Sequence, residues 1–353
     1  MGKHESAAGA SSQRPAAVRE SEKRPRHRKV LPLILVAAAT GLILLCVFIL
    51  KPPEIGFIGG GKQNGDQGGD VTQPDQPADT GDDQPIVTDP ELKKDFYTFL
   101  LAGTNDSYNT DTIILCSVDV QSGKIHMISI PRDSMVDRDI KYRKINNAYG
   151  RKGAEELCTE VTEVTGVPIN YYCVINVDSF ADIVDLIGGV EYNVPIRMYH
   201  PDADAQYTID LQKGWQTLNG NEAAQFCRFR STSENDFGRM NRQKDFLLAT
   251  LRQVREKFEL SQVEGFIDVF NESVKTNMSV RDMVWFYINV LSKLDLDNDV
   301  STDTLPFTHT GKYMGEDYVY LDADGIVELV NATVNPYTTD ITKDDLDIIC
   351  LED

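Results

Sequence analysis

Two arginines, Arg228 and Arg230, lie two residues apart in a stretch whose mixture of apolar and charged residues predicts a strand, residues 224–230. Alternate side chains of a strand point to the same face, so both guanidinium groups would lie side by side. Neighbouring cations repel each other unless an anion lies between them. Because a guanidinium group donates paired hydrogen bonds to phosphates and carboxylates, this spacing predicts an anion-binding site.

A second polar group, formed by Arg239, Arg242 and Gln243, opens a long predicted helix, residues 239–258. Their offsets of three and four place them on one face of that helix. The start of a helix carries a partial positive charge, so arginines gathered there favour binding of a phosphate. Asp236, just before the helix, is either part of this site or an ordinary N-cap. The alternative is that these arginines pair with acidic residues on a solvated surface.

Charged residues also lie at the ends of predicted strands. Asp111 precedes the strand at residues 112–120, and Arg132 and Asp133 follow the strand at residues 124–130. Ligands of α/β folds bind at such sheet edges. Carboxylates suit Mg²⁺ or Mn²⁺, and Mg²⁺ is usually held by one or two carboxylates together with substrate phosphates. A single Asp beside a turn is more often structural, so the metal site is one of two interpretations.

The elements that must position these residues alternate between strands and helices. Further strands are predicted at residues 96–102, 171–177 and 190–196, and helices at residues 152–165, 179–187, 262–275 and 280–294. This alternation predicts a layered α/β/α domain with a central mixed β-sheet. We expect the main folded domain to occupy residues 91–300, with residues 301–353 as a C-terminal extension that packs on the same domain.

The N-terminal residues predict a membrane anchor. Residues 1–29 hold eight lysines and arginines against three acidic residues, and residues 30–50 contain no charge. About 20 apolar residues span a bilayer as a helix. The positive-inside rule then places the basic arm in the cytoplasm and the rest of the chain outside the cell. A cleaved signal peptide, the alternative, would have an apolar core of only about 7 to 15 residues.

Amino-acid composition supports three further predictions about the chain. Residues 51–90 are rich in Gly, Pro, Asp and Gln, which predicts a disordered extracellular linker. The net charge of −20 argues against a nucleic-acid partner beyond the basic arm. Five cysteines follow the anchor: Cys116, Cys158, Cys173, Cys227 and Cys350. Because their number is odd and their spacing wide, we expect most of them to be buried thiols. Whether two of them form a disulfide stays open.

Several motifs together resemble the LytR-CpsA-Psr proteins. They are SIPRDS, KINNAY, the turn at Gly188–Val190, and FCRFR followed by DFGRMNRQ, spread over residues 96–251. Members of that family attach glycopolymers such as teichoic acids or capsule to peptidoglycan, taking them from a polyprenyl pyrophosphate carrier. The resemblance therefore implies a membrane-anchored phosphotransferase whose partners are the lipid-linked glycopolymer, peptidoglycan and the membrane.

The resemblance also implies roles for single residues. The pyrophosphate would be contacted by the basic and amide residues named above, with Asp236 positioning the arginines, and Asp111 would help to hold the metal ion. The chain departs from the family where Gly103 and Thr104 are followed by Asn105 instead of Asp. Either Asn105 or Asp106 is then the second metal ligand. A further departure is Asn109, which replaces a frequent arginine.

The implied reaction is attack by a peptidoglycan hydroxyl on the phosphorus next to the glycan, with polyprenyl monophosphate leaving. Such transfers need charge neutralisation and alignment, which arginines and a metal ion supply. Asp111 or Asp133 could assist deprotonation. The lipid tail needs an apolar slot, for which residues 96–101, 171–177 and 246–251 are candidates, although each also fits plain core. A lipid pyrophosphatase and a non-catalytic wall-binding or sensing module remain as alternatives.

Overall fold

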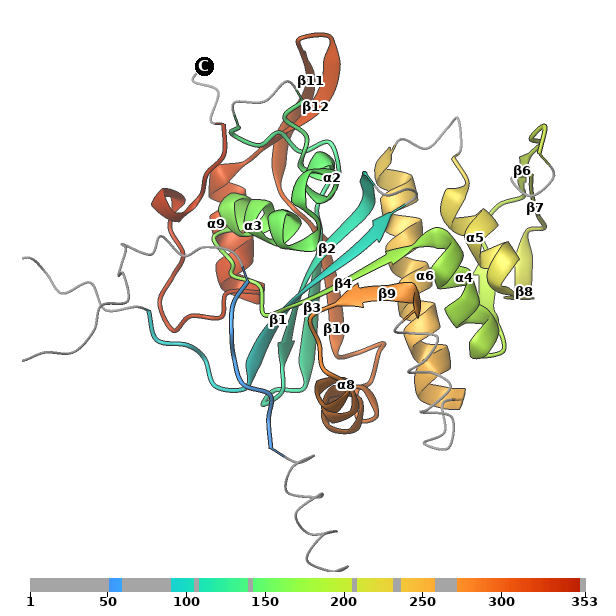
Figure 1. Ribbon diagram of the computed structural model, residues 1–353, viewed down its shortest axis with the longest axis horizontal. Helices are drawn as coiled ribbons and strands as arrows, with labels where there is room; N and C mark the ends of the chain where they lie inside the picture. The colour runs from blue at the N-terminus through green and yellow to red at the C-terminus, as the bar shows by residue number, and fades with distance from the viewer. Residues whose placement is uncertain are drawn as a thin grey trace, which may run out of the picture. The chain divides into compact units, whose positions relative to one another are not determined.

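The computed structural model of the 353-residue chain describes residues 51–58, 90–104, 108–138, 142–204, 208–230, 236–257 and 272–349. A six-stranded sheet lies at the centre, in the order β10-β3-β2-β1-β4-β9 (Figure 1). Strands β1 and β4 are parallel, as are β3 and β10, and the other neighbours are antiparallel. The predicted mixed sheet is confirmed, with strands β1 (Phe96–Thr104), β2 (Thr110–Asp119), β3 (Lys124–Ser129), β4 (Tyr171–Asn176), β9 (Val274–Thr276) and β10 (Val300–Thr304).

Helices cover both faces of this sheet, as the alternating pattern predicts (Figure 1). On one side, α2 (Ala148–Lys152), α3 (Ala154–Thr165) and α9 (Ala323–Thr333) enclose a core that includes Leu100 and Ile128. On the other side lie α4 (Val177–Leu186), α5 (Gly220–Arg228), α6 (Asp236–Lys257) and α8 (Val280–Phe286). There Tyr97, Phe99 and Ile114 of the sheet pack with Trp285 and Phe286 of α8.

Two glycines form turns at the positions that the sequence predicts. Residues 121–123 connect β2 to β3, with Gly123 at φ 67°. Helix α3 ends at Gly166, whose φ of 70° and ψ of 0° form a left-handed cap. Both conformations have positive φ, which glycine adopts without a steric penalty.

The strand predicted at residues 224–230 is wrong, because this segment is helix α5 and the two residues that follow it. Asn219 caps the helix: its side chain accepts from the backbone N–H of Glu222, and the Glu222 side chain accepts from the N–H of Asn219. This reciprocal pair is a capping box. Phe226 and Cys227 are buried against the neighbouring helices. The alternation of charge that resembles a strand lies in the last turn of this helix.

The helix predicted at residues 262–275 is wrong at its end. Residues 258–271 lie outside the described residues, and Val274 and Lys275 belong to strand β9, which pairs with β4. The β-branched residues Val274 and Thr276 suit a strand. Helix α8 continues into a π-helical turn, η5 (Tyr287–Leu291), within the predicted helix of residues 280–294.

Smaller elements complete the fold. Three two-stranded sheets are formed by β5 (Val190–Val194) with β8 (Gly214–Leu218), β6 (Met198–His200) with β7 (Ile209–Leu211), and β11 (Phe307–Tyr313) with β12 (Glu316–Leu321). Short 3₁₀ turns are η2 (Ile145–Asn147) and η6 (Lys343–Asp345). Within residues 301–353, β10 extends the central sheet and α9 packs on its core.

The first described residues contact the domain. Ile58 donates its N–H to the carbonyl of Ile169 at 2.8 Å, and Tyr97 donates its hydroxyl to the carbonyl of Pro53 at 3.2 Å. The predicted linker is therefore wrong for Pro53 to Ile58, while residues 59–89 lie outside the described residues, as do the predicted arm and membrane helix at residues 1–50. Within the described ranges, none of the helices is both long and apolar enough to cross a bilayer.

Candidate functional site

The polar residues of the site come from strand ends that share one edge of the sheet. Gly103, near the end of β1, lies beside Thr112 at the start of β2. Strand β3 is antiparallel to β2, so its end lies at the same edge, and β4 also ends there, with Asn176 beside Thr104. The edge predicted to collect the polar residues therefore forms.

Asp111 is the centre of the site. Arg132 donates a hydrogen bond from Nη1 to Asp111 Oδ1, and Arg239 Nη2 lies 3.6 Å from the same oxygen. Arg239 is only 4% exposed, and a buried cation costs free energy unless an anion compensates it. One carboxylate therefore holds two guanidinium groups side by side, an arrangement that suits paired hydrogen bonds to a phosphate.

Asp133 extends the charged group. Its Oδ2 lies 3.8 Å from Arg132 Nε, and its Oδ1 lies 3.4 Å from Lys144 Nζ. Lys144 also lies 3.6 Å from Glu316 Oε2. The sequence contained Lys144 in the KINNAY motif, but nothing in the spacing indicated that it would reach Asp133.

Gln243 and Arg242 join helix α6 to the end of α5. Gln243 accepts from the hydroxyl of Thr112 at 2.6 Å and donates to the carbonyl of Cys227 at 3.0 Å. Arg242 donates to the carbonyl of Phe229 at 2.7 Å. These contacts satisfy carbonyls that the end of a helix leaves without partners inside the helix. Gln243 therefore reaches β2 at the site, whereas Arg242 holds the chain that follows α5.

Among the described residues, no contact joins Arg228 or Arg230 to Asp111. Arg228 donates to Asp178 of α4, whose side chain is 84% exposed. Arg230 is exposed. Because the segment is helical, the argument that placed both arginines on one face of a strand fails. Asp236 is the first residue of α6, and its side chain is not among those that the structure describes.

An apolar cavity of about 470 Å³ opens beside this charged group. Its polar lining includes Asp111, Thr112 and Gln243. Its apolar lining comes from the sheet, α4, α6, α8 and η5, including Leu101, Ile175, Phe180, Leu247, Leu251 and Val284. Each of the three apolar runs named from the sequence contributes residues. A cavity with this lining suits a long apolar chain whose anionic end meets Arg132 and Arg239.

Two thiols belong to the cavity wall. Burial raises the pKa of Cys173 to about 11 and that of Cys227 to about 12, so both stay neutral at physiological pH. Cys116 and Cys158 are also buried, and all four of these cysteines are free. The expectation that most cysteines are buried thiols is confirmed for this part of the chain, and Cys350 lies outside it.

A metal ion would have one clear protein ligand here. No group of three His, Cys, Asp or Glu side chains within the described ranges could hold a metal by itself. Asn105 and Asp106 lie outside those ranges. The Asp111 carboxylate, lining the cavity beside the two arginines, fits the mode in which Mg²⁺ is shared between one carboxylate and substrate phosphates.

Known proteins carry the same domain. Polyisoprenyl-teichoic acid–peptidoglycan teichoic acid transferase TagV of Bacillus subtilis is 28% identical over 245 residues, which cover 65% of this chain and 61% of TagV. TagU of Halalkalibacterium halodurans, named as the same kind of transferase, is 30% identical over 227 residues, covering 62% of this chain and 72% of TagU. The chain thus spans less than two thirds of the length of TagV.

The fold agrees with a solved structure. The crystal structure of B. subtilis TagV superposes with a TM-score of 0.60 at 25% identity, over 68% of this chain and 96% of that one. The model of the LytR_cpsA_psr family matches residues 63–335, a range that contains the sheet, the charged group around Asp111 and the cavity. Because the family model matches more than half of its length, this chain belongs to the LytR_cpsA_psr family.

Proposed function

We propose that the protein is a membrane-anchored phosphotransferase that moves a glycopolymer from a polyprenyl pyrophosphate carrier to peptidoglycan. The observation that carries this proposal is the continuity between the apolar cavity and the charged group at its polar end. Asp111 belongs to both, because it lines the cavity and contacts Arg132. A ligand that fits both parts has an apolar tail and an anionic head, as a prenyl pyrophosphate does.

The arginines would bind the head of this ligand. Arg132 and Arg239 approach the same carboxylate oxygen, so a pyrophosphate at this point would meet two guanidinium groups. Guanidinium groups stay protonated and donate paired hydrogen bonds, which suits the charge that develops during transfer of a phosphoryl group. Arg228 and Arg230, at the end of α5 and just after it, would contribute further positive charge to binding of the head.

The reaction joins a hydroxyl oxygen of peptidoglycan to the phosphorus next to the glycan. The bond from that phosphorus to the bridging oxygen breaks, and polyprenyl monophosphate leaves. Asp133 or Asp111 would accept the proton of the hydroxyl. Mg²⁺ or Mn²⁺ bound with Asp111 would neutralise further phosphate charge.

The substrates follow from the family relationship. TagV and TagU are named as transferases of teichoic acid to peptidoglycan, so the carried glycopolymer is proposed to be a teichoic acid, capsule or similar polymer. The anchor would be the helix at residues 30–50, with the N-terminus in the cytoplasm and the catalytic domain outside the cell. Peptidoglycan lies on that outer side.

The test uses the full chain in lipid nanodiscs with a polyprenyl pyrophosphate-linked saccharide, peptidoglycan fragments and Mg²⁺. Polyprenyl phosphate release and saccharide attachment are both measured. Arg132→Ala should abolish both, whereas Arg252→Ala should retain them, because Arg252 pairs with Asp297 on the exposed side of α6. Release without attachment would indicate a pyrophosphatase. Binding of the lipid with neither release nor attachment would indicate a wall-binding module.

A further inference from the structure

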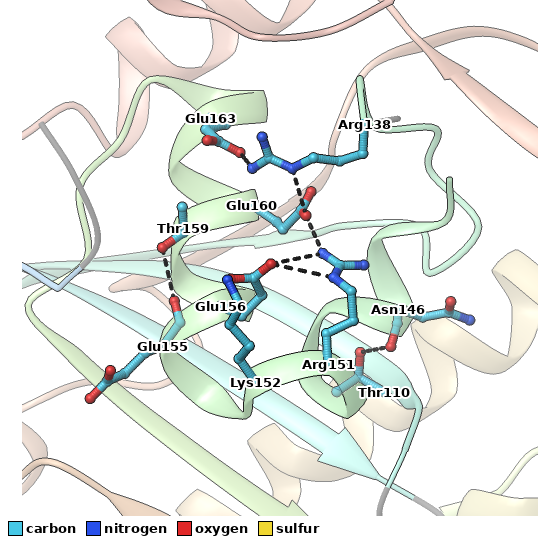
Figure 2. Close-up of polar contacts among 10 residues, drawn as sticks. All are labelled: Thr110, Arg138, Asn146, Arg151, Lys152, Glu155, Glu156, Thr159, Glu160 and Glu163. Atoms are coloured by element: carbon cyan, nitrogen blue, oxygen red, sulfur yellow. Dashed lines mark hydrogen bonds and ion pairs between the residues drawn. The ribbon is translucent and has the colours of Figure 1, made fainter. Parts of the chain in front are cut away.

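Helix α3 carries a buried carboxylate, Glu160, on the far side of the sheet from the cavity. Its side chain is only 1% exposed. Figure 2 shows two arginines directed at it: Arg138 donates from Nε at 3.0 Å, and Arg151 donates from Nη2 to the same oxygen. A buried carboxylate persists only where cations and hydrogen bonds compensate it. Both compensating arginines come from the chain that precedes α3.

Each arginine also holds a second glutamate of α3. Arg138 donates to Glu163, and Arg151 lies 3.3 Å from Glu156 (Figure 2). A guanidinium group that makes two such contacts is fixed in orientation as well as position. Arg138 and Arg151 are thereby both attached to helix α3, and Glu160 Oε1 is the acceptor that they share.

This attached segment leads directly to the charged site. Asn146 donates its N–H to the carbonyl of Arg132 at 3.1 Å, and its own carbonyl accepts from the hydroxyl of Thr110 at 3.4 Å (Figure 2). Thr110 immediately precedes Asp111. Ile145 donates to the carbonyl of Ser134 at 3.0 Å. The backbone of Asn146 therefore lies between the residues that carry the Arg132 guanidinium group and the Asp111 carboxylate.

We propose that Glu160 is a positioning residue for the pyrophosphate head of the substrate, an inference that rests on the proposed function. By fixing Arg138 and Arg151, Glu160 holds Asn146 in place, and Asn146 sets the separation of Arg132 and Asp111. Glu160 touches neither the cavity nor the charged group. Its removal is expected to change how the head is held and to leave the apolar cavity intact.

The test compares two ligands that share a tail. Geranylgeranyl pyrophosphate would use the cavity and the charged group, whereas geranylgeraniol would use the cavity alone. Glu160→Gln keeps the shape of the side chain and removes its charge. We expect Glu160→Gln to weaken binding of the pyrophosphate about 10- to 100-fold, the usual consequence of a small displacement of positioned groups. Binding of the alcohol, measured by calorimetry on the full chain in nanodiscs, should stay unchanged.

Two further variants complete the design. Glu155→Gln makes the same chemical change at an exposed position of α3 and should bind both ligands as the wild type does. Glu160→Asp restores the charge and should recover part of the lost affinity. Turnover of the lipid-linked saccharide by Glu160→Gln should show a raised KM, because the head is bound less tightly, and a lowered kcat, because its alignment is also lost.

The outcomes separate the two proposals. Equal weakening of both ligands would show that Glu160 supports only the general fold, and unchanged affinity for the pyrophosphate would show that the head does not depend on it; either result overturns the positioning role. A wild type that binds the pyrophosphate without turnover would refute the transfer reaction while the affinities still test Glu160. A wild type that binds only the alcohol would refute the anionic site and the inference together.

Discussion

One carboxylate oxygen of Asp111 lies close to two arginines from distant parts of the chain. Arg132 follows β3 and Arg239 lies in the first turns of α6, where the helix end adds its own partial positive charge. The carboxylate reduces the repulsion between the two cations. Because Asp111 also lines the cavity, both guanidinium groups are held beside it.

Asp111→Asn should therefore remove activity more than stability. The amide keeps the size of the side chain, but it no longer compensates Arg132 and Arg239 or offers a charged ligand to a metal ion. We expect turnover to fall about 100-fold or more, in line with the loss of a positioned charge in an active site. The matched control is Asp178→Asn at the exposed partner of Arg228, which should keep most of the activity. Equal losses in the two variants would contradict the central role of Asp111.

The cysteines give a second prediction for single residues. Burial raises the pKa of Cys227 to about 12 and that of Cys158 to about 12, so the reactive thiolate is scarce at pH 8. Alkylation by iodoacetamide should be slow in the folded protein and fast in denaturant. Geranylgeranyl pyrophosphate should slow the labelling of Cys227, which lines the cavity, more than that of Cys158, which packs in the other layer. Mass spectrometry of the labelled peptides measures both rates.

At the scale of elements, α5 is placed by its two ends. Its first residue, Gly220, donates its N–H to Asp185 of α4 at 2.7 Å, and its last carbonyls are bound by side chains of α6. Glycine is needed at the first position because a Cβ there would overlap the carbonyl oxygen of Ala181. Helices α4, α5 and α6 are therefore joined into one packed group.

Gly220→Ala should disturb this group. Forcing a methyl group into a packed contact costs about 1–3 kcal/mol, and the free energy of unfolding should fall by that amount in a denaturant titration. Gly56→Ala is the control, because a Cβ at Gly56 meets nothing within 4 Å. A Gly220→Ala variant as stable as the wild type would show that α4 and α5 separate easily.

At the scale of the whole molecule, the sheet separates two layers with different tasks. One layer carries the cavity between the sheet and α4, α6 and α8. The other layer carries α3 and the network around Glu160. The charged group lies at the edge of the sheet, between the two layers.

Filling the cavity should test whether its apolar part binds the tail. Val284→Phe adds volume to a wall of the cavity that is far along the sequence from the charged residues. We expect affinity for geranylgeranyl pyrophosphate to fall about tenfold or more, since the tail loses apolar contact, while inorganic pyrophosphate binds as before. Stability should not decrease, because the new ring fills open space. If the prenyl ligand binds equally well to the variant, the tail lies elsewhere.

The sequence predicted the sheet edge and most of the charged group, but not Lys144 or Glu316. Strand ends follow from apolar runs and turns, so Asp111, Arg132 and Arg239 could be placed together. Arg228 and Arg230 were misplaced because their local alternation imitates a strand, whereas the capping box at Asn219 and Glu222 determines a helix. A cavity cannot be predicted this way, since an apolar residue in a wall and one in the core give the same pattern.

Glu160 illustrates a different limit. On the helical pattern of α3 a glutamate predicts a solvated face, and its burial depends on two arginines supplied by the preceding chain. The family motif KINNAY marked the segment between those arginines without indicating what holds it. Long-range pairing of this kind leaves no periodic signal.

The π-helical turn η5 places a local irregularity in a wall of the cavity. Tyr287 and Leu291 of this turn line the cavity. A π-helical turn holds about one residue more than an α-helical turn, so deletion of one residue within it would restore an α-helical turn and shift the side chains of that turn. Such a deletion would change the apolar wall without changing any residue of the charged group around Asp111.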